Sequence, residues 1–325
     1  MLLLGALFVA ANRSEVPAAG RALRDANLLL VAGAAALSAL FMVNLGALYA
    51  ASYRAVGLRV PFLAMLRISC GAAFLNMISK SGGMGGLALF LRDAGRRAQP
   101  RSRVVSAYVL AALLGHIAFT LTLAAALVVV RLDGRLTRAE VIGSAVFAVY
   151  VIAQAVVFVA AARSRAALRA FHAFPGRVRR HLLGFVGRHR PPAEPDHEAA
   201  DDLHEAMGLL LHRPRRMLIP GFHALMVEAI GVATIWMVLA SFGEQVHPQV
   251  PLVAYSISVL FSIVGVLPAG LGFAEASLGA VFASFGIPGP TAAVAVITYR
   301  LFEVWIPFVI GGWASQSVAR EKARP

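Results

Sequence analysis

The chain has 325 residues, of which 59% are hydrophobic and only 14% charged, and its mean hydropathy is +0.75. Soluble domains carry about 25% charged residues, so this composition excludes an ordinary soluble protein and indicates a membrane protein. The formal net charge of +14 is typical of basic loops between membrane spans rather than of a nucleic-acid-binding surface, and we expect no nucleic-acid partner.

Metal and cofactor chemistry finds little support in the sequence. The single cysteine, Cys70, lies in an apolar stretch, which excludes an internal disulfide and a cysteine-built metal site. No spacing of His, Asp and Glu suggests a metal site, and the GGMGG stretch follows no predicted strand, so a nucleotide-binding loop fails on context. We therefore expect neither a metal nor a cofactor.

Long runs without a formally charged side chain predict membrane-spanning helices. Crossing a hydrocarbon core of about 30 Å takes about 20 helical residues. The runs cover residues 27–53, 104–130, 141–162, 245–274 and 276–299. Met217 to Phe242 is a further span, interrupted by Glu228, and the last span is centred on Leu301 to Trp313, with Arg300 and Glu303 at its start. We predict an all-α polytopic membrane protein with about seven to nine crossings.

A basic segment divides the chain into two membrane halves. Residues 163–216 carry eleven arginines around an acidic patch, and their pattern predicts amphipathic helices at the lipid headgroups. The positive-inside rule places this segment and the C-terminal tail in the cytoplasm of a bacterial-type cell, with the protein in the plasma (inner) membrane. We therefore divide the chain into an N-terminal membrane half (1–162), a cytoplasmic segment (163–216) and a C-terminal membrane half (217–325).

The first eleven residues are apolar but too short to cross the membrane as a helix. A signal peptide would have a basic region before the apolar stretch. Since this region is absent, we expect a helix shortened by a late start.

Two glycine-rich breaks interrupt the apolar runs at corresponding places in the two halves. The first covers Asn76 to Gly86 and the second covers Val266 to Glu275. Gly and Pro end helices, and backbone freed at membrane depth must be buried in protein or line a wet cavity. The two breaks are either re-entrant hairpins or turns between full crossings. If both are hairpins they enter from opposite sides, as in the inverted repeats of many transporters.

These motifs resemble the flippase-like membrane domain of the lysylphosphatidylglycerol synthase family, in which an Asn, a Pro and a Gly-Gly pair form the first motif and a Pro-x-x-x-Gly stretch with a following Glu forms the second. The matching residues of this chain are Asn76, Gly82, Gly83, Gly85 and Gly86, then Pro268, Gly270, Gly272 and Glu275, and Arg300 in the last span. The chain departs from the pattern at Lys80, where the family usually has Pro. The resemblance implies movement of a lipid, or a lipid-linked headgroup, between leaflets. A soluble aminoacyl-transferase domain is not part of the sequence, so we do not expect aminoacyl-lipid synthesis.

Ionisable groups inside a bilayer are candidates for function, because each costs about 2.5–3.5 kcal/mol on insertion scales. Lys80 stands among glycine amides, a combination suited to a phosphate, which favours an anionic phospholipid or a polyprenyl-phosphate lipid as substrate. Glu275 is either a proton carrier or the partner of Arg300 or Lys80. We place these residues, with the motif residues above, in the substrate site, whereas Arg67 is expected to reach the cytoplasmic interface.

Two further carboxylates are candidates for coupling. Glu228 lies near the middle of its span, and Glu303 shares a helix face with Arg300, with which it can pair. We predict a lipid flippase or transporter. The alternatives are a membrane enzyme that modifies a lipid headgroup, which lacks the usual His/Asp/Ser cluster, and a scaffold whose basic segment recruits anionic lipid or another protein.

Overall fold

The computed structural model describes residues 24–79, 83–132, 213–245, 247–264 and 268–320, with scattered positions between 145 and 159 and position 208. This described part consists of helices and turns, which confirms the all-α prediction. Five of its helical segments are long and apolar enough to cross a membrane: 28–55, 62–79, 101–132, 214–241 and 289–318. The predicted features at 1–11 and at 163–207 lie outside the described residues.

The first half contains four helices, α3 (Leu28–Ala55), α4 (Phe62–Ser79), α5 (Met84–Arg96) and α6 (Arg101–Leu132). Helix α3 begins where Asn27 caps it, because the Asn27 Oδ1 atom accepts a hydrogen bond from the Leu29 amide at 3.0 Å. Helix α6 begins directly after Pro100, whose carbonyl accepts from the Val104 amide at 3.2 Å.

The second half repeats this order. A short 3-10 turn, η1 (Pro214–Met217), leads into α10 (Leu218–Ser241), and α11 (Gln249–Val264), the 3-10 turn η2 (Pro268–Gly270) and α12 (Phe273–Ser284) follow. The chain then forms α13 (Gly289–Arg300), a π-helical turn η3 (Leu301–Trp305) and α14 (Ile306–Arg320).

One predicted boundary in this half is wrong. The last span is the continuous sequence α13, η3 and α14, so Arg300 and Glu303 lie near its middle instead of at its start. The uncharged run 276–299 holds two helices, because the turn between α12 and α13 contains Gly286, with a φ of +81°, and Pro288. Helix α12 therefore ends at Ser284.

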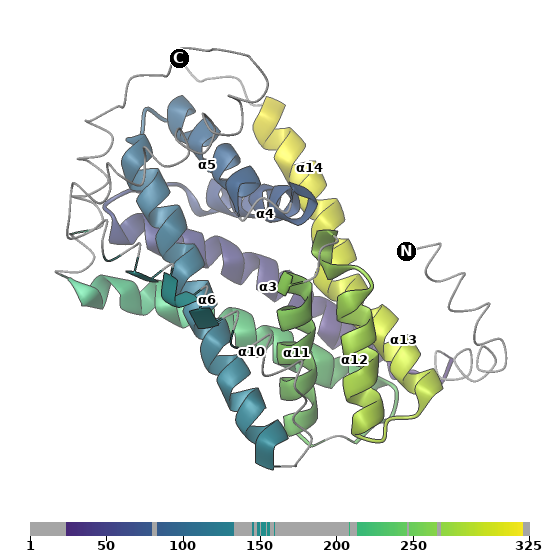
Figure 1. Ribbon diagram of the computed structural model, residues 1–325. Helices are drawn as coiled ribbons and strands as arrows, with labels where there is room; N and C mark the ends of the chain where they lie inside the picture. Colours follow the sequence, from purple (N-terminus) through teal and green to yellow (C-terminus); the bar gives the residue numbers. More distant parts are fainter. Residues whose placement is uncertain are drawn as a thin grey trace, which may run out of the picture.

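The first helices of the two halves run antiparallel and side by side (Figure 1). The Asn27 amide before α3 donates to the carbonyl of Ser241 at the end of α10, at 2.8 Å. Further along, the Asn44 side chain of α3 donates to the carbonyl of His223, near the start of α10, at 2.8 Å. Corresponding elements that run in opposite directions are what an inverted repeat requires, so this packing supports the predicted repeat.

Each half continues with a hairpin of two unequal arms. In the first half α4 and α5 form the hairpin, and in the second α11 and α12 stand side by side (Figure 1). The second arms have 13 and 12 residues, so they extend only about 20 Å and 18 Å. Neither can cross a core of about 30 Å, and these lengths favour hairpins over pairs of full crossings.

The apolar core has two main parts, and α6 contributes to both. The first lies between α3, α4, α5 and the beginning of α6, around Phe90 and Leu110, and the second lies between the end of α6 and helices α10 to α13, around Ile235 and Leu260. Large apolar side chains such as Leu121, Phe222 and Trp313 are exposed on the outer faces of the long helices. Such surfaces suit contact with lipid rather than water.

Candidate functional site

The first break is shorter than the sequence predicted. Helix α4 continues to Ser79 and α5 begins at Met84, so Asn76, Gly85 and Gly86 are helical. The reason is a cap supplied from the neighbouring helix: the Gly86 amide, one of the donors left unpaired in the first turn of a helix, donates to the Asn76 Oδ1 atom at 2.7 Å. Lys80 and Gly82 lie outside the described residues.

Tyr108 of α6 holds the two sides of the first break together through hydrogen bonds. Its hydroxyl donates to the carbonyl oxygen of Gly83 at 2.8 Å and accepts a hydrogen bond from the Asn76 Nδ2 atom at 2.9 Å. A Cβ atom added at Gly86 would lie 2.6 Å from that Nδ2 atom and 2.8 Å from the tyrosine oxygen. A residue without a side chain is therefore needed at position 86 for α4, α5 and α6 to meet.

The second break is organised by Arg300, which lies at the end of α13 and is 1% exposed. Its Nε atom donates to Oε1 of Glu275 at 2.8 Å, and one Nη atom donates to Oε2 of Glu303 at 2.9 Å. The other Nη atom donates to the carbonyl oxygen of Ala269, inside the break, at 2.7 Å. The predicted pairings of Arg300 with Glu275 and with Glu303 are thus confirmed, and we call these three residues the Arg300 cluster.

The backbone of the second break is held in an unusual conformation. Ala269 has a φ of 54°, which is rare for a residue with a side chain. Its carbonyl oxygen accepts a hydrogen bond from the Ser262 hydroxyl of α11, at 3.2 Å, and another from the Arg300 side chain. The Gly272 amide, at the start of α12, donates to Oε2 of Glu275 at 2.7 Å. Glu275 therefore links the first turn of α12 to α13.

The two breaks follow one plan. In each, a side chain of the following long helix donates to a carbonyl of the break: Tyr108 to Gly83, and Arg300 to Ala269. In each, a side-chain oxygen of the hairpin accepts a hydrogen bond from a backbone amide at the start of the second arm: Asn76 from Gly86, and Glu275 from Gly272. Such amides have no partner within their own helix. The structure thus gathers the predicted residues into two separate constellations, one per half.

A cavity of about 320 Å³, lined mainly by apolar atoms, lies between α3, α6, α10, α11, α13 and η3, and we call it the Glu228 cavity. The predicted coupling residues Glu228 and Glu303 both line it. Its other hydrogen-bonding side chains are those of Ser38, His116, Thr234, Tyr255 and Tyr299. The cavity therefore connects the middle of α10 to the Arg300 cluster through Glu303.

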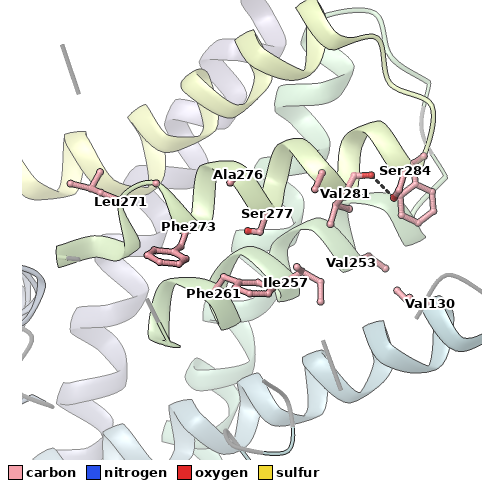
Figure 2. A pocket seen from close by; sticks show the side chains of 13 residues that line it. Val130, Val253, Ile257, Phe261, Leu271, Phe273, Ala276, Ser277, Val281 and Ser284 are labelled. Atoms are coloured by element: carbon pink, nitrogen blue, oxygen red, sulfur yellow. Dashed lines mark hydrogen bonds between the residues drawn. The ribbon is translucent and has the colours of Figure 1, made fainter. Parts of the chain in front are cut away.

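An apolar groove of about 630 Å³ lies beside the second hairpin, between α6, α11 and α12 (Figure 2). It reaches from Leu271 and Gly272 at the break to Ser284 and Phe285 at the far end of α12. Between these ends it is lined by side chains such as those of Phe261 and Phe273. Such a lining suits a hydrocarbon chain, and one end of the groove adjoins the break that the Arg300 cluster holds.

Comparison with known families places the chain in one of them. A family model described as the lysylphosphatidylglycerol synthase TM region matches residues 1–311. The chain belongs to this family. A curated relative, the UPF0104 membrane protein of Methanothermobacter thermautotrophicus, is 26% identical over 87 residues, or 27% of this chain. The matched part spans only 26% of that relative's length.

Membership in the lysylphosphatidylglycerol synthase TM family confirms the resemblance derived from the glycine-rich motifs, and it agrees with the five spans in identifying a multi-pass membrane protein. The matched range contains both breaks, Arg300 and Glu303.

Sequence reasoning missed three residues that hold the site together. Tyr108 carries an uncharged hydroxyl within a long apolar run, and only its position opposite the first break gives it a role. Ala269 acts through its carbonyl, for which a sequence offers no signal. Tyr255 faces the cavity across Gly231, where a Cβ atom would lie 2.1 Å from the tyrosine ring.

Proposed function

We propose that this protein moves a phospholipid, or a lipid-linked headgroup, between the two leaflets of the membrane. The main support for this proposal is the second break, where the Arg300 cluster adjoins an apolar groove. The groove runs beside a hairpin whose second arm is too short to cross the membrane. A lipid needs both kinds of surface: polar contacts for its headgroup and an apolar track for its chains. Paired broken helices in inverted halves are the arrangement in which transporters build such sites.

The chemistry of the break favours an anionic headgroup. A guanidinium binds carboxylate and phosphate oxygens with the same paired geometry, so a phosphate can replace Glu275 as the acceptor of the Nε–H group of Arg300. Glu275 keeps a second partner in the Gly272 amide when this exchange occurs. The predicted contribution of Lys80 adds positive charge to the other break. An anionic phospholipid or a polyprenyl-phosphate lipid is therefore the proposed substrate class.

The experiment uses the purified protein in liposomes that contain a trace of phosphatidylglycerol with a fluorescent headgroup-side label. A membrane-impermeant reductant bleaches the label of the outer leaflet only, so lipid movement appears as bleaching beyond that share. Wild-type protein should increase the bleached fraction. Equal bleaching in vesicles with and without the protein would refute the proposed function.

A pair of isosteric variants tests the site. Glu275→Gln removes the negative charge that pairs with Arg300. Because hydrogen bonds to charged groups contribute about 1.5–3 kcal/mol, we expect about a tenfold or larger change in the rate of lipid movement. Glu244→Gln, in the turn after α10, is the matched control and should move lipid like the wild type. Both variants must elute as the wild type does in size-exclusion chromatography. A folded Glu275→Gln protein with the wild-type rate would remove the second break from the site.

A further inference from the structure

Glu228 differs from the other intramembrane carboxylates that the structure describes. It lies about halfway along α10 and is 7% exposed. Glu275 and Glu303 both hold Arg300, whereas the Oε2 atom of Glu228 has no hydrogen-bond partner among the described residues. A buried charge without a cation is strongly unfavourable in a membrane, so the surroundings of Glu228 suit the neutral acid.

Among the described residues that line the Glu228 cavity there are hydrogen-bonding groups but no Lys or Arg. The groups that can titrate or carry charge are His116 on α6, Tyr255 on α11, Tyr299 on α13 and Glu303 on η3. Helix α3 contributes only Ser38 and Phe41 to this cavity. The Glu228 cavity is lined mainly by apolar atoms, and these side chains supply its few polar groups.

The position of Tyr255 depends on a glycine of the same helix as Glu228. Gly231 lies three residues further along α10, so the two residues share a face. A Cβ atom at position 231 would lie 2.1 Å from Cε2 of Tyr255. The absence of a side chain there allows the tyrosine ring to approach α10 and to line the cavity beside the carboxyl group.

A change in the charge of Glu228 can affect the second break through Glu303 and Arg300. Glu303 lines the same cavity and accepts a hydrogen bond from Arg300, and Arg300 in turn donates to the Ala269 carbonyl of the break. A negative charge on Glu228 would repel the Glu303 carboxylate, because both line one mainly apolar cavity, where charges interact strongly. The pairing of Glu303 with Arg300 would then weaken or rearrange. A neutral Glu228 leaves the Arg300 cluster undisturbed.

We propose that Glu228 binds and releases a proton during transport, and that its charge controls the Arg300 cluster at the second break. This inference rests on the proposed function for its transport part, while proton exchange at Glu228 is a property of the protein itself. The movement of the lipid is then coupled to the movement of a proton, which Glu228 holds at the edge of the Glu228 cavity.

The first measurement is infrared difference spectroscopy of the wild-type protein in liposomes, exchanged between acidic and alkaline buffer. We expect a carbonyl band of a protonated carboxylic acid that is lost on deprotonation. The band should vanish in Glu228→Gln, shift in Glu228→Asp, which keeps a carboxyl group, and remain in the control Glu244→Gln. A pH-dependent band that persists unchanged in folded Glu228→Gln protein would overturn the proposal, as would a wild-type protein without such a band.

The second measurement repeats the labelled phosphatidylglycerol assay with and without an imposed gradient of one pH unit, which corresponds to about a tenfold bias in proton occupancy. The wild-type rate should change by up to about tenfold, and in Glu228→Gln the ratio of the two rates should be about one. A response to a sodium gradient at constant pH, in place of the pH response, would overturn proton coupling. If the wild type moves no labelled lipid, the proposed function fails, while the infrared band still decides whether Glu228 exchanges a proton.

Discussion

Adding a single methyl group at Gly86 tests whether the first break depends on close contact between three helices. In Gly86→Ala the new Cβ atom would lie 2.6 Å from the Asn76 Nδ2 atom and 2.8 Å from the Tyr108 oxygen. Both distances are shorter than van der Waals contact allows, so the asparagine and tyrosine side chains must move. The Gly86 amide then loses its acceptor at 2.7 Å.

The size of the effect follows from three contributions. Overpacking of this kind costs about 1–3 kcal/mol, and the lost hydrogen bond costs about 1 kcal/mol. Alanine gains about 0.5–1 kcal/mol over glycine in a helix. The net expectation is a loss of about 1–3 kcal/mol in the free energy of unfolding.

The same helix supplies a matched control. Gly95 is also in α5, but a Cβ atom there would meet nothing within 4 Å. Gly95→Ala should therefore keep only the helical gain and stabilise the protein by about 0.5–1 kcal/mol. Thermal unfolding in detergent, followed by tryptophan fluorescence, should lower the apparent melting temperature for Gly86→Ala and raise it for Gly95→Ala. If the two variants melted alike, the contact between Gly86, Asn76 and Tyr108 would not hold the break.

Three further variants address the remaining contacts. Tyr108→Phe leaves the Gly83 carbonyl without its donor and should lower stability by about 1–3 kcal/mol in the same melting assay, whereas an unchanged melting temperature would show that the hydroxyl is not needed. Arg300→Lys keeps the charge, but an ammonium group cannot reproduce the forked hydrogen bonds of a guanidinium. We therefore expect the movement of labelled phosphatidylglycerol to slow by about tenfold. A wild-type rate would refute the role of the guanidinium. Gly231→Ala would push a Cβ atom against Tyr255, at 2.1 Å, and should cost about 1–3 kcal/mol in the melting assay; a neutral effect would mean that the ring does not sit over α10.

The sequence predicted the features that depend on chain composition and on charge. Apolar runs of sufficient length predicted the long helices, because the thickness of the membrane sets the length of a span. That Glu275 needs a partner could be predicted because a charge within a membrane is costly alone, but the choice of Arg300 over Lys80 was left open. The glycine-rich motifs located both breaks, and the family resemblance that they carried is confirmed by the family match.

What the sequence could not predict depends on neighbours that are distant along the chain. Asn76 was placed in the break, yet it lies inside α4, and its side chain caps an amide of α5 ten residues later. The last span was placed too late because Arg300 and Glu303 were taken to mark its start, whereas α13, η3 and α14 continue through both residues. Glu228 and Glu303 are 75 positions apart in the printed sequence, and only packing brings them to one cavity.

The two breaks share an arrangement of hydrogen bonds but differ in how strong these hydrogen bonds are. At the first break the described contacts are neutral hydrogen bonds from Tyr108 and Asn76, each worth about 0.5–1.5 kcal/mol. At the second they involve ionised groups around Arg300, each worth about 1.5–3 kcal/mol. The second break is therefore the more firmly held, but its contacts also depend on charge, whereas those of the first do not. Under the proposed function, the contacts of the first break would stay fixed, while those of the second would respond to a change of protonation or to an anionic ligand.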